Sequence, residues 1–176
     1  MRFSSVIFGA FALLTTSVVA IIPPIGFSSC VSKVNQYDKD VKFCTSLNAP
    51  TCYPIIVADI YALIACIQAE IDICVDIKVE LSADVQAQIF AELQPLINAT
   101  IILCTDLIII APIIVLVDLQ AQVEVALKAL LNAWVTLIAD LEICLGLEAK
   151  LIAALWVTLQ AELNLCISAY AGPKIL

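Results

Sequence analysis

The uncharged stretches of this chain are short, and their length limits what the chain can fold into. Apolar runs around positions 97–105, 107–117, 129–139 and 151–161 end at a charged residue after about eleven residues. A helix that crosses a membrane needs about twenty apolar residues, and charges at these intervals would lie in hydrocarbon at considerable cost. Clusters of Lys or Arg that would orient membrane spans are missing as well. The pattern favours helices that pack against each other, with a multi-span integral membrane protein as the alternative.

The chain has the composition of an all-α protein. Glycine is scarce, Ala, Leu, Ile, Glu and Gln dominate, and no segment sustains the alternation of a strand. We therefore predict an up-and-down bundle of about five helices. Caps and breakers set their expected limits: a helix over about 29–45, one from Pro54 to about 80, one capped by Ser82, one that Pro112 opens and Gly146 ends, and one over about 147–170.

Two of these segments repeat one amphipathic pattern. Residues 84–107 align without gaps onto residues 118–141, with eleven identities in twenty-four positions. In the second copy, the polar side chains fall within an arc of about 120° on a helical projection. These side chains are Asp118, Gln122, Lys128, Asn132, Thr136 and Asp140. Trp134 points away from them, so each copy has a narrow polar edge and a wide apolar remainder.

The first twenty residues are predicted to be a secretory signal peptide. Arg2 precedes an apolar run, and Val18 and Ala20 occupy the −3 and −1 positions of a cleavage site. An uncleaved anchor helix is the alternative. We expect an extended segment over 21–28, the helical bundle domain over 29–172 and a tail over 173–176. After cleavage, seven lysines and sixteen acids give a formal charge of −9, which argues against nucleic acid and anionic headgroups as partners.

All eight cysteines follow the predicted signal peptide, and an even count in a secreted domain favours four disulfides. Two pairs are symmetric about Asn48, which predicts nested rungs in a first helical hairpin. The others follow from sharing one end of an up-and-down bundle. The predicted pairs are Cys30–Cys66, Cys44–Cys52, Cys74–Cys144 and Cys104–Cys166. A zinc site is the rival interpretation, but the chain has no C-x2-C spacing and no His.

The apolar fraction is 63%, whereas about half is usual for a soluble domain. More apolar side chains are present than a core of this size needs, so some are expected to line a cavity, form an oligomer interface or face oil. The candidates are Ile108, Ile109, Ile110, Ile113, Ile114, Trp134 and Trp156. The two tryptophans fit core positions as well. Lys128 or Lys150 could meet a ligand carboxylate at a cavity mouth or could simply be solvated.

No arrangement typical of a catalytic site is found. Without His the chain cannot build a Ser-His-Asp or Cys-His pair or a His-ligated metal. The acids alone do not exclude a two-carboxylate site, but they recur at helical intervals typical of a solvated face. We predict no enzyme activity, no cofactor and no metal. Asn98 begins the triplet Asn-Ala-Thr on a polar edge, which predicts N-glycosylation there.

Four segments resemble a known family. They are "VSKVNQYDKDVKFCTSL" (31–47), "IFAELQPLINATIILCTDL" (89–107), "APIIVLVDLQAQVEVAL" (111–127) and "LNLCISAYAG" (163–172). Their apolar spacing resembles that of the fungal hydrophobic surface binding protein A family, which includes lipid-binding cell-wall mannoproteins. The resemblance implies a secreted, all-helical protein of similar length.

The sequence thus predicts a secreted, non-enzymatic protein, extracellular or in the cell wall. We expect it to bind fatty acids or sterols, or to adsorb to hydrophobic surfaces through apolar helix faces. A structural cell-wall protein without a ligand, with possible self-association, remains open beside the membrane-protein alternative. The apolar corner over 105–119 is expected to form either the mouth of the bundle or its first contact with oil.

Overall fold

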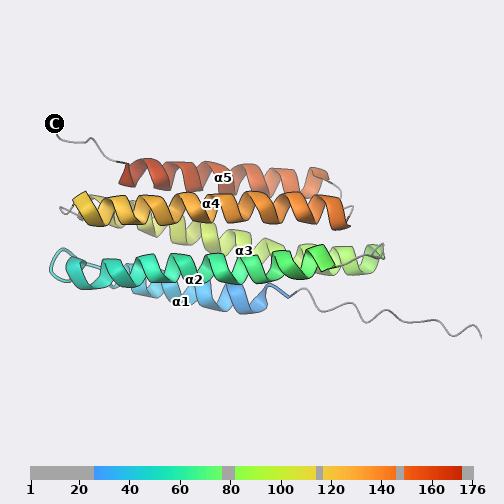
Figure 1. Cartoon of the computed structure of the whole chain (residues 1–176), viewed down its shortest axis with the longest axis horizontal. Helices are drawn as coiled ribbons and strands as arrows, with labels where there is room; N and C mark the ends of the chain where they lie inside the picture. The colour runs from blue at the N-terminus through green and yellow to red at the C-terminus, as the bar shows by residue number, and fades with distance from the viewer. Residues whose placement is uncertain (1–25, 77–81, 114–116, 146–148, 172–176) are drawn as a thin grey trace, which may run out of the picture.

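The computed structural model describes residues 26–76, 82–113, 117–145 and 149–171, and these residues form an all-α bundle (Figure 1). Its elements are α1 (Ser28–Lys42), α2 (Ala49–Asp76), α3 (Ala83–Ile110), the short 3-10 helix η1 (Ala111–Ile113), α4 (Val117–Leu145) and α5 (Ala149–Tyr170). No strand occurs in the described ranges. The predicted fold class, an up-and-down bundle of about five helices, is confirmed.

The helices form a closed ring whose order differs from their order in the chain. Figure 1 shows α1, α3 and α5 running in one direction and α2 and α4 in the other. The main contacts join the parallel pairs α2–α4, α1–α3 and α3–α5, and the antiparallel pairs α4–α5 and α1–α2 complete the ring. Each helix therefore buries apolar side chains against two neighbours.

The polar edge predicted for α4 lies at the surface. Its members are exposed or half-buried: Asp118, Gln122, Lys128, Asn132, Thr136 and Asp140. Trp134, on the opposite side, is fully buried among apolar side chains of the core. The helical periodicity therefore predicted correctly which side of α4 faces its neighbours.

Two predicted helix starts are wrong. α2 begins at Ala49, before Pro54, because the Asn48 carbonyl accepts the Thr51 and Cys52 amides and opens the first turn early. Pro112 lies in η1, and α4 begins only at Val117. Proline suits a 3-10 turn as well as a first helical turn because it lacks an N–H group. The predicted cap of α3 is confirmed, since the Ser82 hydroxyl accepts the Val85 amide at 3.4 Å.

Two disulfides fasten α1 to α2. Cys30 is bonded to Cys66 and Cys44 to Cys52, each with a Cα–Cα distance of 5.9 Å. These are the two pairs predicted from their symmetry about Asn48, and they make the first hairpin a cross-linked unit.

The apolar corner after α3 is closed by two buried tyrosines. The Tyr53 hydroxyl donates to the Ile110 carbonyl at 3.0 Å, and the Tyr170 hydroxyl donates to the Leu107 carbonyl at 2.8 Å. The Leu107 carbonyl also accepts the Ala111 amide, so the tyrosine hydroxyls of α2 and α5 are additional buried donors to the end of α3. Burial raises the pKa of Tyr53 to about 12, which keeps its hydroxyl protonated.

Some predictions fall outside the described residues. They include the signal peptide over 1–20, most of the segment over 21–28 and the tail over 173–176. Ile114 and the side chains of Cys144 and Lys150 lie outside the description as well.

Removing the Tyr53 hydroxyl should loosen this corner. We expect Tyr53→Phe to lower the free energy of unfolding by about 1–2 kcal/mol, because the buried hydrogen bond from the Tyr53 hydroxyl to the Ile110 carbonyl is lost. Urea unfolding with the disulfides intact measures the change. Tyr61→Phe, at an exposed position of the same helix, is the control, and an equal loss in both variants would contradict the role of the buried bond.

Candidate functional site

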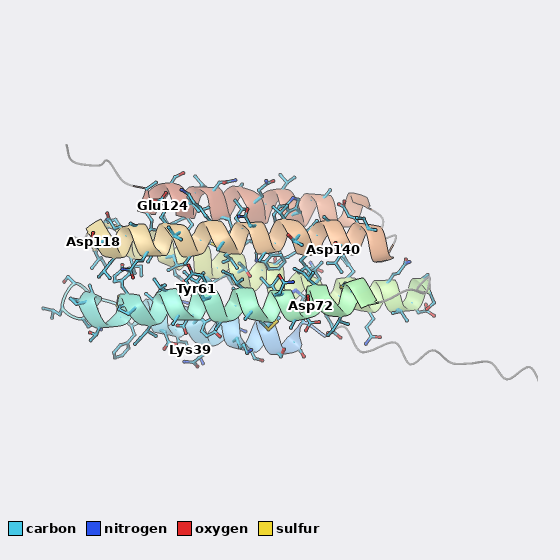
Figure 2. The ribbon with its side chains drawn as sticks, viewed as in Figure 1. Lys39, Tyr61, Asp72, Asp118, Glu124 and Asp140 are labelled. Atoms are coloured by element: carbon cyan, nitrogen blue, oxygen red, sulfur yellow. A yellow bond between two sulfur atoms is a disulfide. The ribbon has the colours of Figure 1, made fainter. Side chains whose placement is uncertain are left out.

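An apolar groove lies between α2 and α4. Its volume is about 370 Å³, and its walls are Val57 and Tyr61 of α2 with Ala121, Gln122 and Val125 of α4. Val57 and Tyr61 are four residues apart, as are Ala121 and Val125, so each pair presents one face of its helix. Figure 2 shows Tyr61 on α2 close to the neighbouring α4, which carries Asp118 and Glu124.

The groove is apolar and only partly covered. Val125 is 58% exposed, and Tyr61 is also exposed. The polar side-chain atoms of the lining belong to the Tyr61 hydroxyl and the Gln122 amide. Concave sites with apolar walls and few polar groups are typical of sites for apolar small molecules. The arrangement can therefore hold a hydrocarbon chain, with a hydroxyl and an amide available to a ligand oxygen.

Lys128, one of the two lysines considered for contact with a ligand carboxylate, already has a partner. Lys128 Nζ lies 2.6 Å from Glu124 Oε1, one helical turn away on α4. Such an exposed pair contributes little to stability, but it reduces the attraction of Lys128 for a second anion. A contact of Lys128 with a ligand therefore stays a prediction.

The predicted apolar contact residues do not form one surface. Ile110 and Trp134 are buried in the core, while Ile109 is exposed. Ile108, Ile113 and Trp156 are partly buried and pack against the core. The Trp134 indole N–H is buried without an acceptor in the described part of the chain, so it is a hydrogen-bond donor inside the bundle. The role of these residues in ligand contact remains a prediction.

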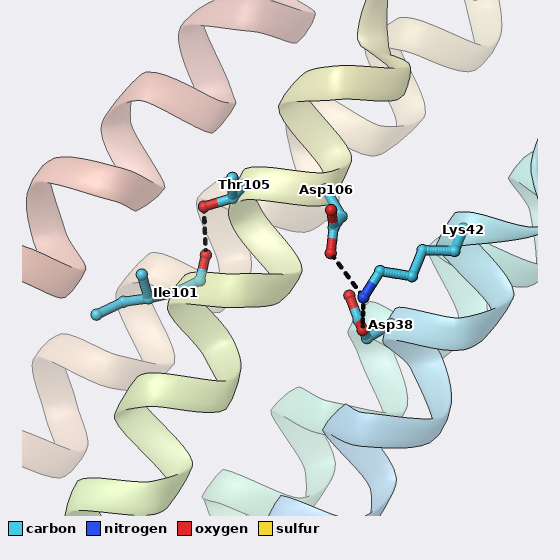
Figure 3. Close-up of polar contacts among 5 residues, drawn as sticks. All are labelled: Asp38, Lys42, Ile101, Thr105 and Asp106. Atoms are coloured by element: carbon cyan, nitrogen blue, oxygen red, sulfur yellow. Dashed lines mark hydrogen bonds and ion pairs between the residues drawn. The ribbon is translucent and has the colours of Figure 1, made fainter.

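Acidic side chains connect helices at several points. Lys42 Nζ of α1 lies 2.6 Å from Asp38 Oδ2 and 3.2 Å from Asp106 Oδ2 of α3 (Figure 3). Burial and the hydrogen bond with Asp38 raise the pKa of Asp106, and Lys42 opposes this change. The ion pairs link α1 to α3, and among the described residues no group of three potential ligands could hold a metal ion.

The start of α1 is capped by carboxylates from other helices. The Phe27 amide donates to Glu92 Oε2 of α3 at 3.1 Å, and Phe27 itself makes no side-chain cap. Glu70 of α2 is buried and accepts a hydrogen bond from the Gly26 backbone. Burial raises the pKa of Glu70, although the Gly26 bond lowers it. These glutamates compensate the free N–H groups of a helix start, which gives them a structural role.

The cysteines outside the first hairpin keep their predicted pairings as proposals. Cys104 of α3 and Cys166 of α5 are buried thiols that contact each other, as expected from their shared end of the bundle. This contact and burial raise the pKa of the Cys104 thiol. Cys74 is buried near the end of α2, and the predicted partner Cys144 has no described side chain.

The predicted glycosylation site lies on the surface of α3. Asn98 is exposed, whereas Thr100 of the same triplet is buried and donates to the Leu96 carbonyl at 2.9 Å. Glycosylation of Asn98 stays a prediction.

The groove residues Val57, Tyr61, Ala121, Gln122 and Val125 were not predicted as a site. Only Gln122 carried a signal, as a member of the polar edge of α4. The groove exists because α2 lies beside α4 in the ring, and this neighbourhood cannot be read from the spacing within either helix.

Comparisons with known proteins agree with this architecture. No protein-family model and no curated protein matches the sequence. Ligand-binding domain 2 of the Penicillium marneffei MP1 protein, complexed with multiple arachidonic acids, is similar with a TM-score of 0.70 and 19% identity over 83% of this chain and 94% of that chain. The chain has the fold of that domain. AfMp4p in complex with palmitic acid is similar with a TM-score of 0.60 and 18% identity, over 82% of this chain and 94% of that chain. The predicted resemblance to fungal lipid-binding proteins is confirmed at the level of the fold.

The carboxyl group of Asp59 in α2 is a weaker acid than an ordinary aspartate. Burial, and secondly the charge of Asp40, raise the pKa of Asp59 to about 6. Its Oδ2 atom has no hydrogen-bond partner among the described residues. The same carboxyl adds to the effect of burial in raising the pKa of Tyr37. Protonated Asp59 is therefore favoured by folding.

The raised pKa of Asp59 makes the stability of the fold depend on pH. The pKa of Asp59 is about 6 in the folded protein and near 4 in the unfolded chain. Its contribution to the free energy of unfolding is therefore complete below about pH 4 and is lost as the pH rises through about 6. We expect Asp59→Asn to be more stable than the wild type by roughly 1–3 kcal/mol at pH 7.5 and equally stable near pH 4. Urea unfolding at both pH values measures this, with Asp72→Asn at an exposed position of α2 as the control. A constant difference between Asp59→Asn and the wild type would contradict the assignment.

Proposed function

We propose that the chain is a secreted, non-enzymatic protein that binds long-chain lipids, with fatty acids as the primary class. The observation that carries the proposal is the apolar groove between α2 and α4. It occurs in a fold shared with two proteins whose structures contain arachidonic acid and palmitic acid. Sterols and hydrophobic surfaces are further partners of the same chemistry.

Binding would be driven by transfer of apolar surface out of water. Each buried methylene contributes about 0.8 kcal/mol, and micromolar affinity corresponds to about 8 kcal/mol. A fatty acyl chain has enough methylenes to reach this affinity even when only part of it is buried. The groove volume of about 370 Å³ lies within the range of small-molecule sites, about 300–1,000 Å³.

The proposed location is the extracellular space or the cell wall. It is supported by the signal-like sequence over 1–20 and by the disulfides of the first hairpin. We propose glycosylation at Asn98 and the further pairs Cys104–Cys166 and Cys74–Cys144 as parts of the secreted form.

The disulfide proposal has a direct check. Peptide mapping of the secreted protein without reduction should recover Cys104 linked to Cys166 and Cys74 linked to Cys144. Recovery of these cysteines as free thiols, or in other pairs, would contradict it.

An integral membrane protein is the second candidate. Four segments are long and apolar enough to cross a membrane by length and composition: Ala49–Cys74, Ala83–Ile113, Asp118–Ile143 and Ile152–Tyr170. Each also carries polar side chains that face outward from the bundle, including Asp72, Asn98, Lys128 and Asn164. These would contact hydrocarbon at considerable cost, so the ligand-binding function is favoured.

A charge placed in the groove should weaken lipid binding. We expect Val125→Glu to reduce the affinity for palmitic acid at least about tenfold, because a carboxylate would replace an apolar wall and repel the ligand's own carboxylate. Titration of delipidated protein with palmitic acid by isothermal calorimetry measures the change.

The matched control is Val157→Glu. Val157 of α5 is 62% exposed and lies outside the groove, compared with 58% for Val125. Its variant should keep the wild-type affinity. Equal affinity in all three proteins would exclude the groove as the site, and the absence of binding by the wild type would contradict the proposed function itself.

A further inference from the structure

The turn between α1 and α2 carries unusually exposed apolar side chains. Phe43 is 79% exposed and Leu47 is 94% exposed, and Ile55 in the early part of α2 is exposed as well. Single exposed apolar residues are ordinary, but several in one place usually mark a contact surface. We call Phe43, Leu47 and Ile55 the hairpin tip.

The hairpin tip is held in shape by covalent and polar bonds. The Cys44–Cys52 disulfide closes the turn. Within it, Asn48 Oδ1 accepts the Thr45 amide at 2.6 Å and the Thr45 hydroxyl at 3.0 Å, and Asn48 Nδ2 donates to the Phe43 carbonyl at 3.0 Å. A turn fixed in this way has little freedom to fold its apolar side chains back onto the bundle.

Charge is absent from the hairpin tip and present at its base. The sixteen residues from Phe43 to Ala58 contain no Asp, Glu, Lys or Arg. The last turn of α1 immediately before them contains Lys39 and Lys42, both exposed. Lys42 is paired with Asp38 and Asp106, so the exposed Lys39 is the cation available beside the apolar tip. An apolar end next to a cation matches the order of acyl chains and phosphates at a lipid surface.

The same end of the bundle holds other uncharged surface. Figure 1 shows the α1–α2 turn at the end where η1 and the start of α4 lie. Ile109 and Pro112 are exposed there, and residues 107–117 carry no charge, with Asp118 the next acid along the chain. The groove residues Val57 and Tyr61 follow the tip directly on α2, so a lipid could pass between this end and the groove over a short path.

We propose that the hairpin tip docks the bundle end-on at the surface of an electrically neutral phospholipid bilayer. Phe43 and Leu47 enter the boundary between headgroups and acyl chains, while Lys39 faces the phosphates. The formal charge of −8 for the whole chain disfavours an anionic surface, which selects a zwitterionic one. This docking would bring the groove to the source of its ligand, and it rests on the proposed lipid binding for the choice of partner.

Flotation with vesicles tests the docking. The secreted protein, with its disulfides intact, is mixed with phosphatidylcholine vesicles, and the bound fraction is measured against lipid concentration. We expect the double variant Phe43→Ser, Leu47→Ser to bind at least about tenfold more weakly, because two large apolar side chains no longer leave water. The matched control is Ile143→Ser, since Ile143 is 80% exposed near the opposite end of α4, and it should bind as the wild type does.

Three results would overturn the proposal. Wild-type binding by the double variant would exclude the tip, and an equal loss in Ile143→Ser would indicate unspecific adsorption. Stronger binding to vesicles that contain phosphatidylglycerol would contradict the choice of a neutral surface. Sedimentation without lipid serves as a fourth check, because a wild-type dimer that the double variant loses would assign the tip to a second copy of the chain.

The failure of docking and the failure of lipid binding can be told apart. Calorimetry with palmitic acid in the absence of vesicles should give the same affinity for the double variant and the wild type. If the double variant binds palmitic acid with the wild-type affinity and also binds vesicles as strongly as the wild type, the docking proposal is refuted and the lipid-binding proposal is not. Circular dichroism before and after heating checks that all variants keep the fold.

Discussion

The helices of this protein carry more apolar surface than their neighbours can cover. α3 and α4 each have a narrow polar edge, and 63% of the residues of the whole chain are apolar. A ring of five helices lets each one bury apolar side chains against two others, but it leaves side chains such as Tyr61, Val125 and Val157 in contact with water. Burial in the ring explains the stability of the fold, and the uncovered remainder explains why we assign it a function in contact with lipids.

Buried hydrogen bonds stabilise the apolar corner at the end of α3. The carbonyls at the end of a helix often bind water with their remaining hydrogen-bonding capacity, whereas this corner lies in an uncharged stretch. The hydroxyls of Tyr53 and Tyr170 bind the Ile110 and Leu107 carbonyls, and the corner can therefore be dry without losing hydrogen bonds. This arrangement requires the start of α2 and the end of α5 to meet at the end of α3, which also closes that end of the ring.

Features that depend on local spacing could be predicted from the sequence. The symmetry of two cysteine pairs about Asn48 predicted the first hairpin, and the polar edge of α4 predicted the burial of Trp134. The starts at Pro54 and Pro112 were wrong because proline is tolerated in several kinds of turn. The groove between α2 and α4 could not be predicted, because it depends on the order of the helices in the ring. The apolar spacing within one helix does not indicate which other helix packs beside it. The exposure of Phe43 and Leu47 could not be predicted either, because it depends on the conformation that the Cys44–Cys52 disulfide and the Asn48 hydrogen bonds give the turn.

The central claim is that the uncovered apolar surface serves lipid binding by a protein that is stable in water. Native mass spectrometry of the secreted chain, purified without detergent, tests it most directly. We expect a soluble protein whose mass exceeds that of the polypeptide and its glycan by one or more long-chain lipids, which organic extraction removes and which palmitic acid replaces. A chain that enters solution only in detergent, or one that carries no lipid and takes up none when palmitic acid is added, would contradict the claim.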